Sequence, residues 1–139
     1  MNISIRGKHR NFPRHLIKKA LSHFGRELCL ENNDIFVDVL IDRDIYPGDG
    51  YAGPETDDEY PMDFTIYISP IGSFKDTFLT LAHEMIHVKQ YHRGELVTTE
   101  DGELAWFNGS REDRWWEDEA YSKETKLYNS FVGRYKKIN

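Results

Sequence analysis

The chain has 139 residues, of which 39% are hydrophobic and 30% charged, and its 24 acidic and 18 basic residues give a net charge of −6. This composition excludes a disordered chain and suits one compact domain with an apolar core. No apolar run is long enough to span a bilayer, and residues 1–10 lack the apolar core of a signal peptide, so we expect neither a membrane segment nor export. The single cysteine, Cys29, rules out an internal disulfide, which favours a reducing cytoplasm.

Charge is unevenly distributed along the chain. Residues 1–26 hold seven basic residues and no acid, so the rest of the chain holds 11 bases against 24 acids, a net of −13. A basic arm can contact nucleic acid, but this one lacks interleaved aromatic residues and the protein as a whole is acidic. We therefore interpret the arm as the solvated face of a helix, and we expect no nucleic-acid partner.

The first half of the chain predicts two strands and a helix. Residues 2–6 alternate like a short strand, and residues 35–41 are rich in β-branched side chains. Between them, Asn11 can cap a helix whose first turn holds Pro13, and Gly25 is a suitable stop. The apolar stripe of this helix comprises Leu16, Ile17, Ala20, Leu21 and Phe24.

The middle of the chain predicts a loop, a strand and a buried helix. Residues 44–61 combine glycines, prolines and acids, which favours a loop. Residues 63–69 alternate as a half-buried strand at a sheet edge. Residues 75–93 are too apolar for a surface helix, so this helix should be largely buried, and Gly94 ends it.

The last third predicts a hairpin and a final helix. Residues 98–109 contain two turn pairs typical of hairpins, Asp101-Gly102 and Asn108-Gly109. Residues 115–132 form a helix whose expected inward side chains are Trp116, Ala120, Leu127 and Phe131. The chain lacks repeats and linkers, so residues 1–139 are predicted to form a single domain, and no pattern points to a particular oligomeric state.

The buried helix carries the residues with catalytic chemistry, His83-Glu84-Met85-Ile86-His87. His83 and His87 project from one face because residues four apart differ by about 40° around a helix axis. Two imidazoles placed in this way can bind one zinc ion. Glu84 flanks the pair and can take a proton from a water molecule that the metal activates. The alternative is a core helix with incidental polar residues, which is disfavoured because burying all three unpaired is costly.

A zinc site needs a third protein ligand from elsewhere in the chain. His92 lies five residues after His87, on the opposite side of the helix from His83, and is better explained as a polar residue at the helix end. The final helix offers Glu117 and Glu119. These two lie about 200° apart on a helix, so only one of them can face the metal.

The histidine pair followed some thirty residues later by Glu117-Asp118-Glu119-Ala120 resembles the gluzincin branch of the zincin metallopeptidases. The resemblance implies that Zn²⁺ is held by His83, His87 and Glu117, with Glu84 as the catalytic base. Ala120 fits the small residue that often follows the ligand three positions later. Tyr121 stands where the family often has an acid, so the usual partner of a zinc histidine is missing from that position.

Residues 60–130 also resemble compact metallopeptidases encoded by bacteriophages, which look like minimal gluzincins. The resemblance implies an α+β fold, a minimal zincin-like catalytic domain in which a small mixed sheet packs on the active-site helix and a C-terminal helix supplies the third ligand. It further implies a peptide or protein substrate that adds in extended form to an edge strand, a role expected for residues 63–69, and the host cytoplasm as the compartment. Tyr121, Tyr128 and His92 are the candidate donors to the oxyanion that forms during hydrolysis.

Three other functions share part of this pattern. A metal-dependent endoribonuclease would use three histidines. In that family the third histidine follows the second by six residues, after a glycine that turns the chain. Here His92 follows His87 by only five residues, and position 90 is Gln90. A peptide deformylase would need a cysteine ligand, and Cys29 lies in no such motif. A catalytically inactive zincin-like binding protein has no need for the general base, whereas Glu84 is intact. The favoured function is therefore zinc-dependent hydrolysis of peptide bonds.

Overall fold

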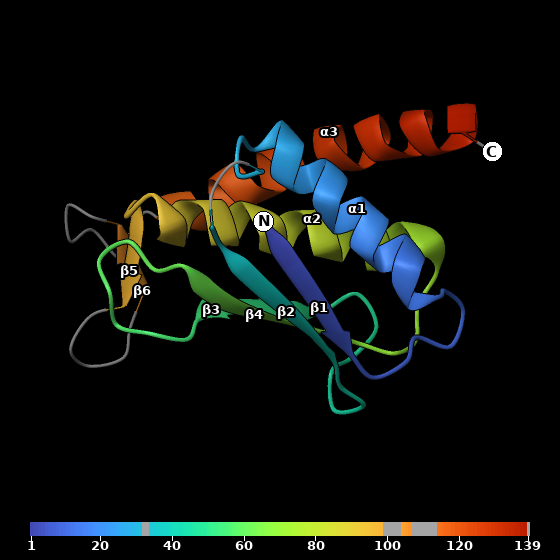
Figure 1. The fold of residues 1–139 in the computed structure, drawn as a ribbon, viewed down its shortest axis with the longest axis horizontal. Helices are drawn as coiled ribbons and strands as arrows, with labels where there is room; N and C mark the ends of the chain where they lie inside the picture. The colour runs from blue at the N-terminus through green and yellow to red at the C-terminus, as the bar shows by residue number, and fades with distance from the viewer. Residues whose placement is uncertain (32–33, 99–103, 107–113, 139) are drawn as a thin grey trace.

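The computed structural model describes residues 1–31, 34–98, 104–106 and 114–138, which form an α+β fold with a small mixed sheet (Figure 1). In chain order its elements are β1 (Asn2–Arg6), α1 (Arg14–Glu27), β2 (Phe36–Ile41), β3 (Gly50–Pro54), β4 (Asp63–Ile68), α2 (Phe74–His92), β5 (Leu96–Thr98), β6 (Leu104–Trp106) and α3 (Trp115–Ile138). No helix in these ranges is both long and apolar enough to cross a membrane.

The main sheet has the strand order β1-β2-β4-β3, in which β1, β2 and β4 are parallel and β3 pairs antiparallel with β4. Two predictions are therefore wrong. Residues 44–61 contain strand β3, and the strand at residues 63–69 is internal, because β3 occupies the edge beside it. The sequence of β3 is Gly-Tyr-Ala-Gly-Pro, which lacks β-branched residues. Its strand conformation comes from pairing with β4 rather than from local propensity.

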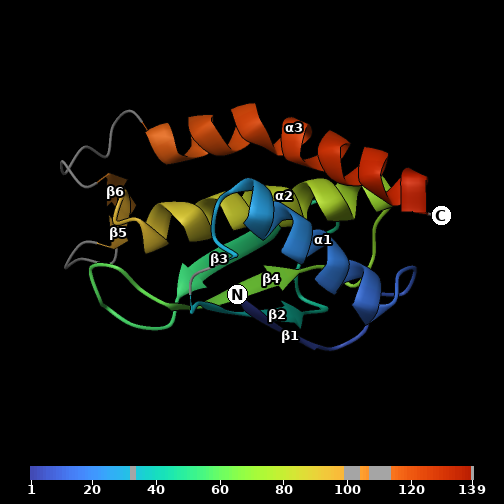
Figure 2. The same ribbon diagram turned by 45° about the horizontal axis from the view of Figure 1, so that its top comes forward.

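The three described helices lie on one face of this sheet (Figures 1 and 2). α1 and α2 contact the strands, and α3 packs on α2 on the side away from the sheet. α2 is consequently enclosed between β3 and β4 on one side and α3 on the other. This central position explains why nearly every side chain from Leu81 to Tyr91 is buried, as predicted for this helix.

One apolar cluster joins the sheet to all three helices. Its fully buried members include Phe24 of α1, Val39 of β2, Ile66 of β4 and Met85 of α2. The stripe predicted for the first helix and the four inward residues predicted for the last helix are buried, as expected. Burying an aliphatic or aromatic side chain of this size contributes roughly 1.5–3 kcal/mol, so this cluster is what holds the three layers together.

The ends of α1 differ from the prediction. Asn11 does not cap the helix, because the preceding position is Pro13 and the Asn11 side chain instead donates to the carbonyl oxygen of Gly72. Gly25 does not end it either. The helix continues to Glu27 and closes with Cys29 in the left-handed region at φ 61°, a position more often taken by glycine. The bond from Leu30 N to Gly25 O completes this end.

The helix at residues 75–93 and the hairpin agree better with the prediction. Ser73 caps α2 by accepting a hydrogen bond from Asp76 N, and Gly94 follows the helix at φ 71°. β5 and β6 pair antiparallel, with Leu96 opposite Trp106. The two predicted turn pairs, Asp101-Gly102 and Asn108-Gly109, lie outside the described residues.

Candidate metal centre

The middle of α2 buries three polar side chains side by side. His83, Glu84 and His87 are 9%, 5% and 8% exposed, and one ligand atom from each lies within 4.8 Å of the others. Buried polar groups are costly unless they are paired or bind a metal. This group could therefore hold a metal ion.

The first turn of α3 brings Glu117 to the same point. Its Oε1 lies 2.6 Å from Nε2 of His87 and 3.5 Å from Nε2 of His83, and the two Nε2 atoms are 3.2 Å apart. The ligands of a tetrahedral zinc ion with bonds of about 2.0–2.2 Å lie roughly 3.3 Å from one another. The separation of the two nitrogen atoms matches that value, and the shorter contact with Glu117 is that of a charged hydrogen bond.

The other ring nitrogen of each histidine contacts an acceptor. Nδ1 of His83 lies 2.8 Å from Oε2 of Glu124, and Nδ1 of His87 lies 2.8 Å from Oε1 of Gln90. The amide of Gln90 has only one suitable orientation, because its Nε2 donates to the carbonyl oxygen of Trp116 and to Glu119. Both Nδ1 atoms therefore carry the hydrogen, which leaves a lone pair on each Nε2.

When both imidazoles are neutral, three acceptor atoms converge with no donor between them: the two Nε2 lone pairs and Oε1 of Glu117. One proton on His87 can relieve only its contact with Glu117. A cation with several coordination positions satisfies all three atoms at once, and two imidazoles with a carboxylate form a donor set that suits zinc. The residues present therefore fit a metal ion, and the Nδ1 contacts orient the rings for it.

Protons and charge within the centre support the same arrangement. Burial opposes the charged form of His87, but its hydrogen bond with Glu117 and the charge of Glu84 outweigh burial and raise its pKa. The hydrogen bond with His87 in turn lowers the pKa of Glu117. A proton thus holds this pair together in the metal-free chain, at the position that a metal ion would take.

Two carboxylates compete as the third ligand beside the histidines. Glu84 belongs to the buried group on α2, yet Glu117 is the carboxylate that contacts both Nε2 atoms. The direct contacts favour Glu117, because a ligand oxygen must reach the same point as the two nitrogens. Glu84 is then a neighbouring buried carboxylate that need not bind the ion.

Glu119, the alternative ligand, is engaged elsewhere. It contacts Lys89 at 2.8 Å and Lys123 at 2.8 Å, and it accepts from Gln90. Burial opposes its ionised form, but hydrogen bonds from Lys123, Lys89 and Gln90 outweigh burial and lower its pKa to about 2. Glu119 therefore supports the Gln90 amide that orients His87 rather than facing the two histidine Nε2 atoms.

Glu84 lies between the histidines and the edge of the sheet. Burial is the main cause that raises its pKa to about 7, opposed by the charge of His87 and assisted by Glu117 and Glu124. Strand β3 passes close over it: a Cβ built on Gly50 would stand 3.3 Å from Cγ of Glu84 and 2.6 Å from Cγ2 of Thr80. Only glycine allows this approach of the edge strand to α2.

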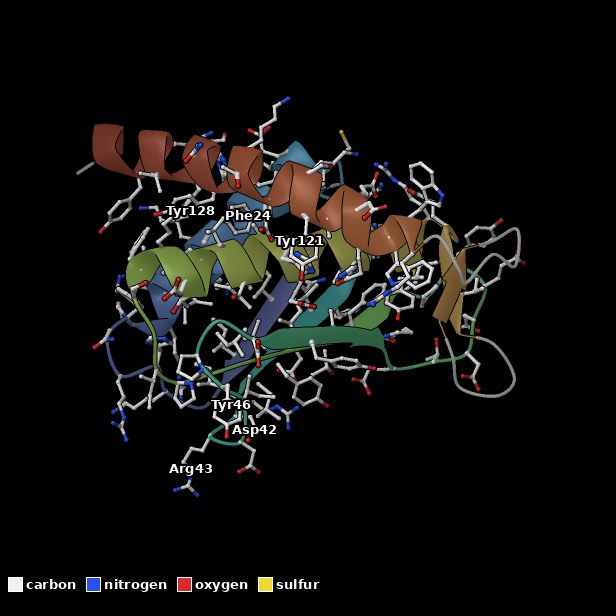
Figure 3. All side chains as sticks on the ribbon, turned by 180° about the vertical axis from the view of Figure 1, so that it is seen from behind. Phe24, Asp42, Arg43, Tyr46, Tyr121 and Tyr128 are labelled. Carbon is white, nitrogen blue, oxygen red and sulfur yellow. The ribbon has the colours of Figure 1, made fainter. Side chains whose placement is uncertain are left out.

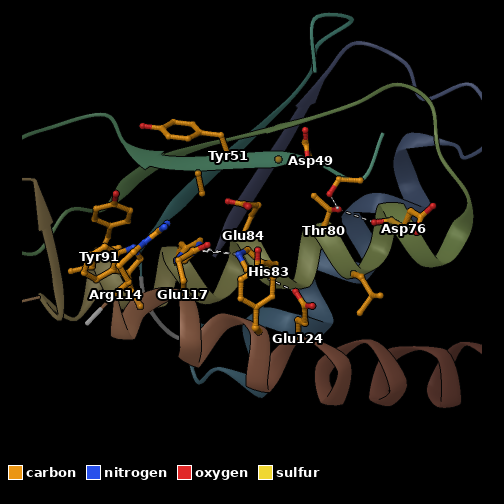
Figure 4. A pocket seen from close by; sticks show the side chains of 18 residues that line it. Asp49, Tyr51, Asp76, Thr80, His83, Glu84, Tyr91, Arg114, Glu117 and Glu124 are labelled. Atoms are coloured by element: carbon orange, nitrogen blue, oxygen red, sulfur yellow. Dashed lines mark hydrogen bonds and ion pairs between the residues drawn. The ribbon is translucent and has the colours of Figure 1, made fainter. Parts of the chain in front are cut away.

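These groups line a cleft of about 420 Å³ between β3, α2 and the start of α3 (Figure 4). Gly50, Tyr51 and Ala52 form its wall on the sheet side. Asp49, Asp76 and Glu124 lie toward the N-terminal end of α2, whereas Arg114 lies at the opposite end (Figure 4). The candidate metal centre is thus at the middle of an open groove rather than in a closed core cavity.

The remaining predicted site residues are dispersed. His92 is bonded to the carbonyl oxygen of Pro61 and does not line the cleft. Of the candidate oxyanion donors only Tyr121 lines it, with its ring 4.7 Å from that of His83 (Figure 3). Trp116 also lines the cleft, Trp115 is 57% exposed, and the Trp106 side chain lies outside the described residues.

Sequence reasoning missed three contributors to the centre. Glu124 follows Glu117 by seven residues, which is two helical turns and therefore the same face of α3. Gln90 follows His87 by three residues, the usual spacing of neighbours on one face. The sequence spacing could therefore have predicted the roles of Glu124 and Gln90. The position of Gly50 above Glu84 depends on how β3 pairs with β4, so spacing could not predict it.

Searches against protein-family models, curated proteins and solved structures found no match to this chain.

Proposed function

We propose that this protein is a zinc-dependent peptide hydrolase in which His83, His87 and Glu117 hold the metal. The proposal is carried by one observation, the convergence of the two histidine Nε2 atoms and Oε1 of Glu117, from two helices, within 3.5 Å of one another. Hydrolytic zinc sites use three such ligands and leave a position open for water. When bound, zinc acts as a Lewis acid toward the substrate carbonyl and brings the pKa of water close to neutrality.

Glu84 is the general base of the proposed reaction. A carboxylate oxygen of Glu84 takes a proton from the attacking water, and the same oxygen then delivers this proton to the nitrogen of the leaving amine. Burial raises the pKa of Glu84 to about 7 in the metal-free chain. A cation bound beside it would lower this pKa and so favour the ionised form that a general base needs.

Strand β3 is the proposed binding site for the substrate backbone. It is the edge of the main sheet and forms a wall of the cleft. An extended peptide can add to such an edge through main-chain hydrogen bonds. This places a peptide bond above the centre, so the substrate role expected for residues 63–69 moves to residues 50–54. Tyr121, exposed in the same cleft, is the proposed hydroxyl donor to the oxyanion.

The decisive experiment combines metal analysis of the purified chain with cleavage of a peptide library in the presence and absence of a chelator. We expect about one zinc per chain and cleavage that the chelator abolishes and added zinc restores. The Glu84→Gln variant should retain zinc and lose cleavage by at least about a hundredfold. Asp118→Asn, an exposed acid beside Glu117, is the matched control and should cleave normally.

Each alternative function gives a different result in the same assays. Cleavage of RNA but not of peptides would favour the endoribonuclease. Bound zinc without any hydrolysis, in a chain whose Glu84→Gln variant behaves identically, would leave an inactive binding protein. A chain that binds no metal would contradict the proposal itself.

A further inference from the structure

A second cavity lies on the opposite side of the helical layer from the cleft, between α1 and the C-terminal part of α3. Its volume is about 460 Å³ and its surface is mostly apolar. The two helices diverge here, with α1 crossing α2 obliquely while α3 runs along it (Figure 2). Phe131 and Tyr135 of α3 and His23 of α1 contribute the aromatic part of this α1–α3 groove.

Basic side chains surround the α1–α3 groove. Lys18, Lys19, Arg26 and Arg134 line it, and none of the residues described as lining it is an acid. Within the described part of the chain, these four side chains form no ion pair. The solvated-face interpretation explains exposed cations on a helix, but it does not explain why they gather around an apolar groove.

The basic surface continues beyond the groove. An adjoining cavity formed by residues 8–15 shares His15 with it and is bordered by Lys8, Arg10 and Arg14. Together these residues form a cationic row along α1 and the loop before it. A row of this length offers more positive charge than a single phosphate can use, and it fits an extended polyanion.

The groove also contains an unsatisfied buried atom. His23 is 4% exposed. Among the buried side-chain nitrogen and oxygen atoms of the described residues, its Nδ1 is the one without a hydrogen-bond partner. Its Nε2 contacts the Ser130 hydroxyl at 2.9 Å, and that hydroxyl donates to Glu27. Nε2 therefore carries the hydrogen and Nδ1 is a free acceptor. Nδ1 is fully covered, so a ligand N–H in the groove would satisfy it after a shift of the His23 ring.

We propose that the α1–α3 groove binds single-stranded nucleic acid, with a base in the groove and the phosphates along the cationic row. A nucleobase is a flat ring with N–H donors, which matches the apolar surface and the acceptor on His23. The backbone supplies the linear negative charge that the row of cations fits. The acidic net charge of the protein does not oppose this, because no residue described as lining the groove is an acid; Glu27 lies behind it, 3.7 Å from Nε2 of His23.

Two other polyanionic partners fit less well. A membrane-binding helix places large apolar side chains on its outer face, whereas the outer positions of α1 in this region are Lys18, Lys19, Ser22 and Arg26. An acidic protein segment would neutralise the cations but would bring no flat ring with an N–H donor. Both partners therefore serve as competitors in the test.

The test measures fluorescence anisotropy of a labelled oligothymidylate of about twenty nucleotides with the full-length chain. We expect saturable binding. The logarithm of the association constant should fall linearly with the logarithm of the salt concentration, with a slope of about −3, as for four phosphate contacts on a single strand. An abasic strand of the same length should bind at least about tenfold more weakly, because it lacks the stacking contribution.

A matched pair of variants separates the groove from general charge. Lys18→Gln/Lys19→Gln/Arg134→Gln removes three groove cations and should lower affinity at least about tenfold and reduce the salt slope by about 2. Arg43→Gln/Lys75→Gln/Lys126→Gln removes three exposed cations outside the groove and should bind within about twofold of wild type. Arg43 is on the loop after β2, across the sheet from α3 (Figure 3).

Several results would overturn the proposal. The first two are absence of binding at about 50 mM salt and an equal loss of affinity in both triple variants. The third is an abasic strand that binds as tightly as oligothymidylate. The fourth is displacement of the labelled strand by anionic vesicles or polyglutamate as effectively as by unlabelled strand. The comparison with the abasic strand uses only wild-type protein, so it remains valid if a variant fails to fold. None of these measurements depends on zinc or on hydrolysis.

Discussion

Oε2 of Glu124 lies 2.8 Å from Nδ1 of His83, two helical turns beyond Glu117 on α3. An acid is thus present beside a proposed zinc histidine although Tyr121 occupies the position where the gluzincins, which the sequence motif resembles, often have one. The helical period allows this exchange, because a side chain seven residues along returns to nearly the same face. One face of α3 therefore carries both Glu117, the proposed ligand, and Glu124, which orients the ring of His83.

Replacing Glu124 with alanine should weaken zinc binding while leaving the ligands in place. Loss of a partner that orients a metal histidine typically reduces metal affinity by about 10–100-fold. Glu124→Gln keeps an acceptor oxygen and should lose less. Competition with a chromogenic chelator measures the affinity, and Asp118→Asn is the control on the same helix. Unchanged affinity in Glu124→Ala would show that the contact does not orient His83.

The two candidate ligands on α3 should separate cleanly when each is removed. Glu117→Ala should lose zinc, because its oxygen is the one that contacts both histidines. Glu119→Ala should retain zinc but lose roughly 1–3 kcal/mol of stability, because the buried Lys89 and the Gln90 amide lose a partner. Metal analysis and urea unfolding of both variants measure the two effects. The reverse pattern would make Glu119 the ligand.

The stability of the metal-free chain should depend on pH through Glu84. Burial raises its pKa from 4.5 to about 7, so between these values the folded state keeps a proton that the unfolded state has lost. Stability therefore falls as pH rises through this window, by up to about 3 kcal/mol. Glu84→Gln cannot titrate and should become more stable than wild type as pH rises.

Urea unfolding at several pH values, with a chelator present, measures this difference. His87 also loses stabilisation as pH rises, since its folded pKa is raised above 6.5, and the charge of Glu84 is one cause of that rise. The difference between wild type and Glu84→Gln therefore reports the coupled titration of Glu84 and His87. A difference that stays constant from acid to neutral pH would mean that Glu84 titrates with the same pKa in the folded and unfolded states.

The close approach of β3 to α2 should make Gly50 intolerant of a side chain. In Gly50→Ala the new Cβ would meet Thr80 Cγ2 at 2.6 Å, which should cost about 1–3 kcal/mol and reduce cleavage by displacing the cleft wall. Gly133→Ala is the contrasting control. Its Cβ meets nothing within 4 Å, and alanine in a helix interior should add about 0.5–1 kcal/mol. Thermal unfolding compares them; equal behaviour would contradict the packing.

The helical period predicted much of this molecule in advance. The spacing of His83 and His87 placed both imidazoles on one face, and the apolar residues around them predicted burial of the helix that carries them. The inward residues of the last helix, such as Ala120 and Phe131, followed from the same period. These features are local, so they depend only on the conformation of one segment.

Other features required the tertiary structure. Strand β3 was taken for a loop because its glycines and proline carry no strand propensity, and only the antiparallel register with β4 makes it a strand and the sheet edge. Asn11 looked like a cap, but its side chain reaches Gly72, sixty-one residues away. Contacts of this kind join segments whose separation along the chain contains no information about their distance in space.

The sequence by itself determined that α2 presents two histidines and a glutamate on a buried helix, because a period of 3.6 residues relates side chains along one helix. Only the tertiary structure decided which glutamate of α3 meets them. Glu117 and Glu119 are equally available in the sequence, and the choice depends on how α3 is rotated against α2. That rotation is set by burial of Trp116, Ala120 and Leu127, which directs Glu117 toward the histidines and Glu119 toward Lys89.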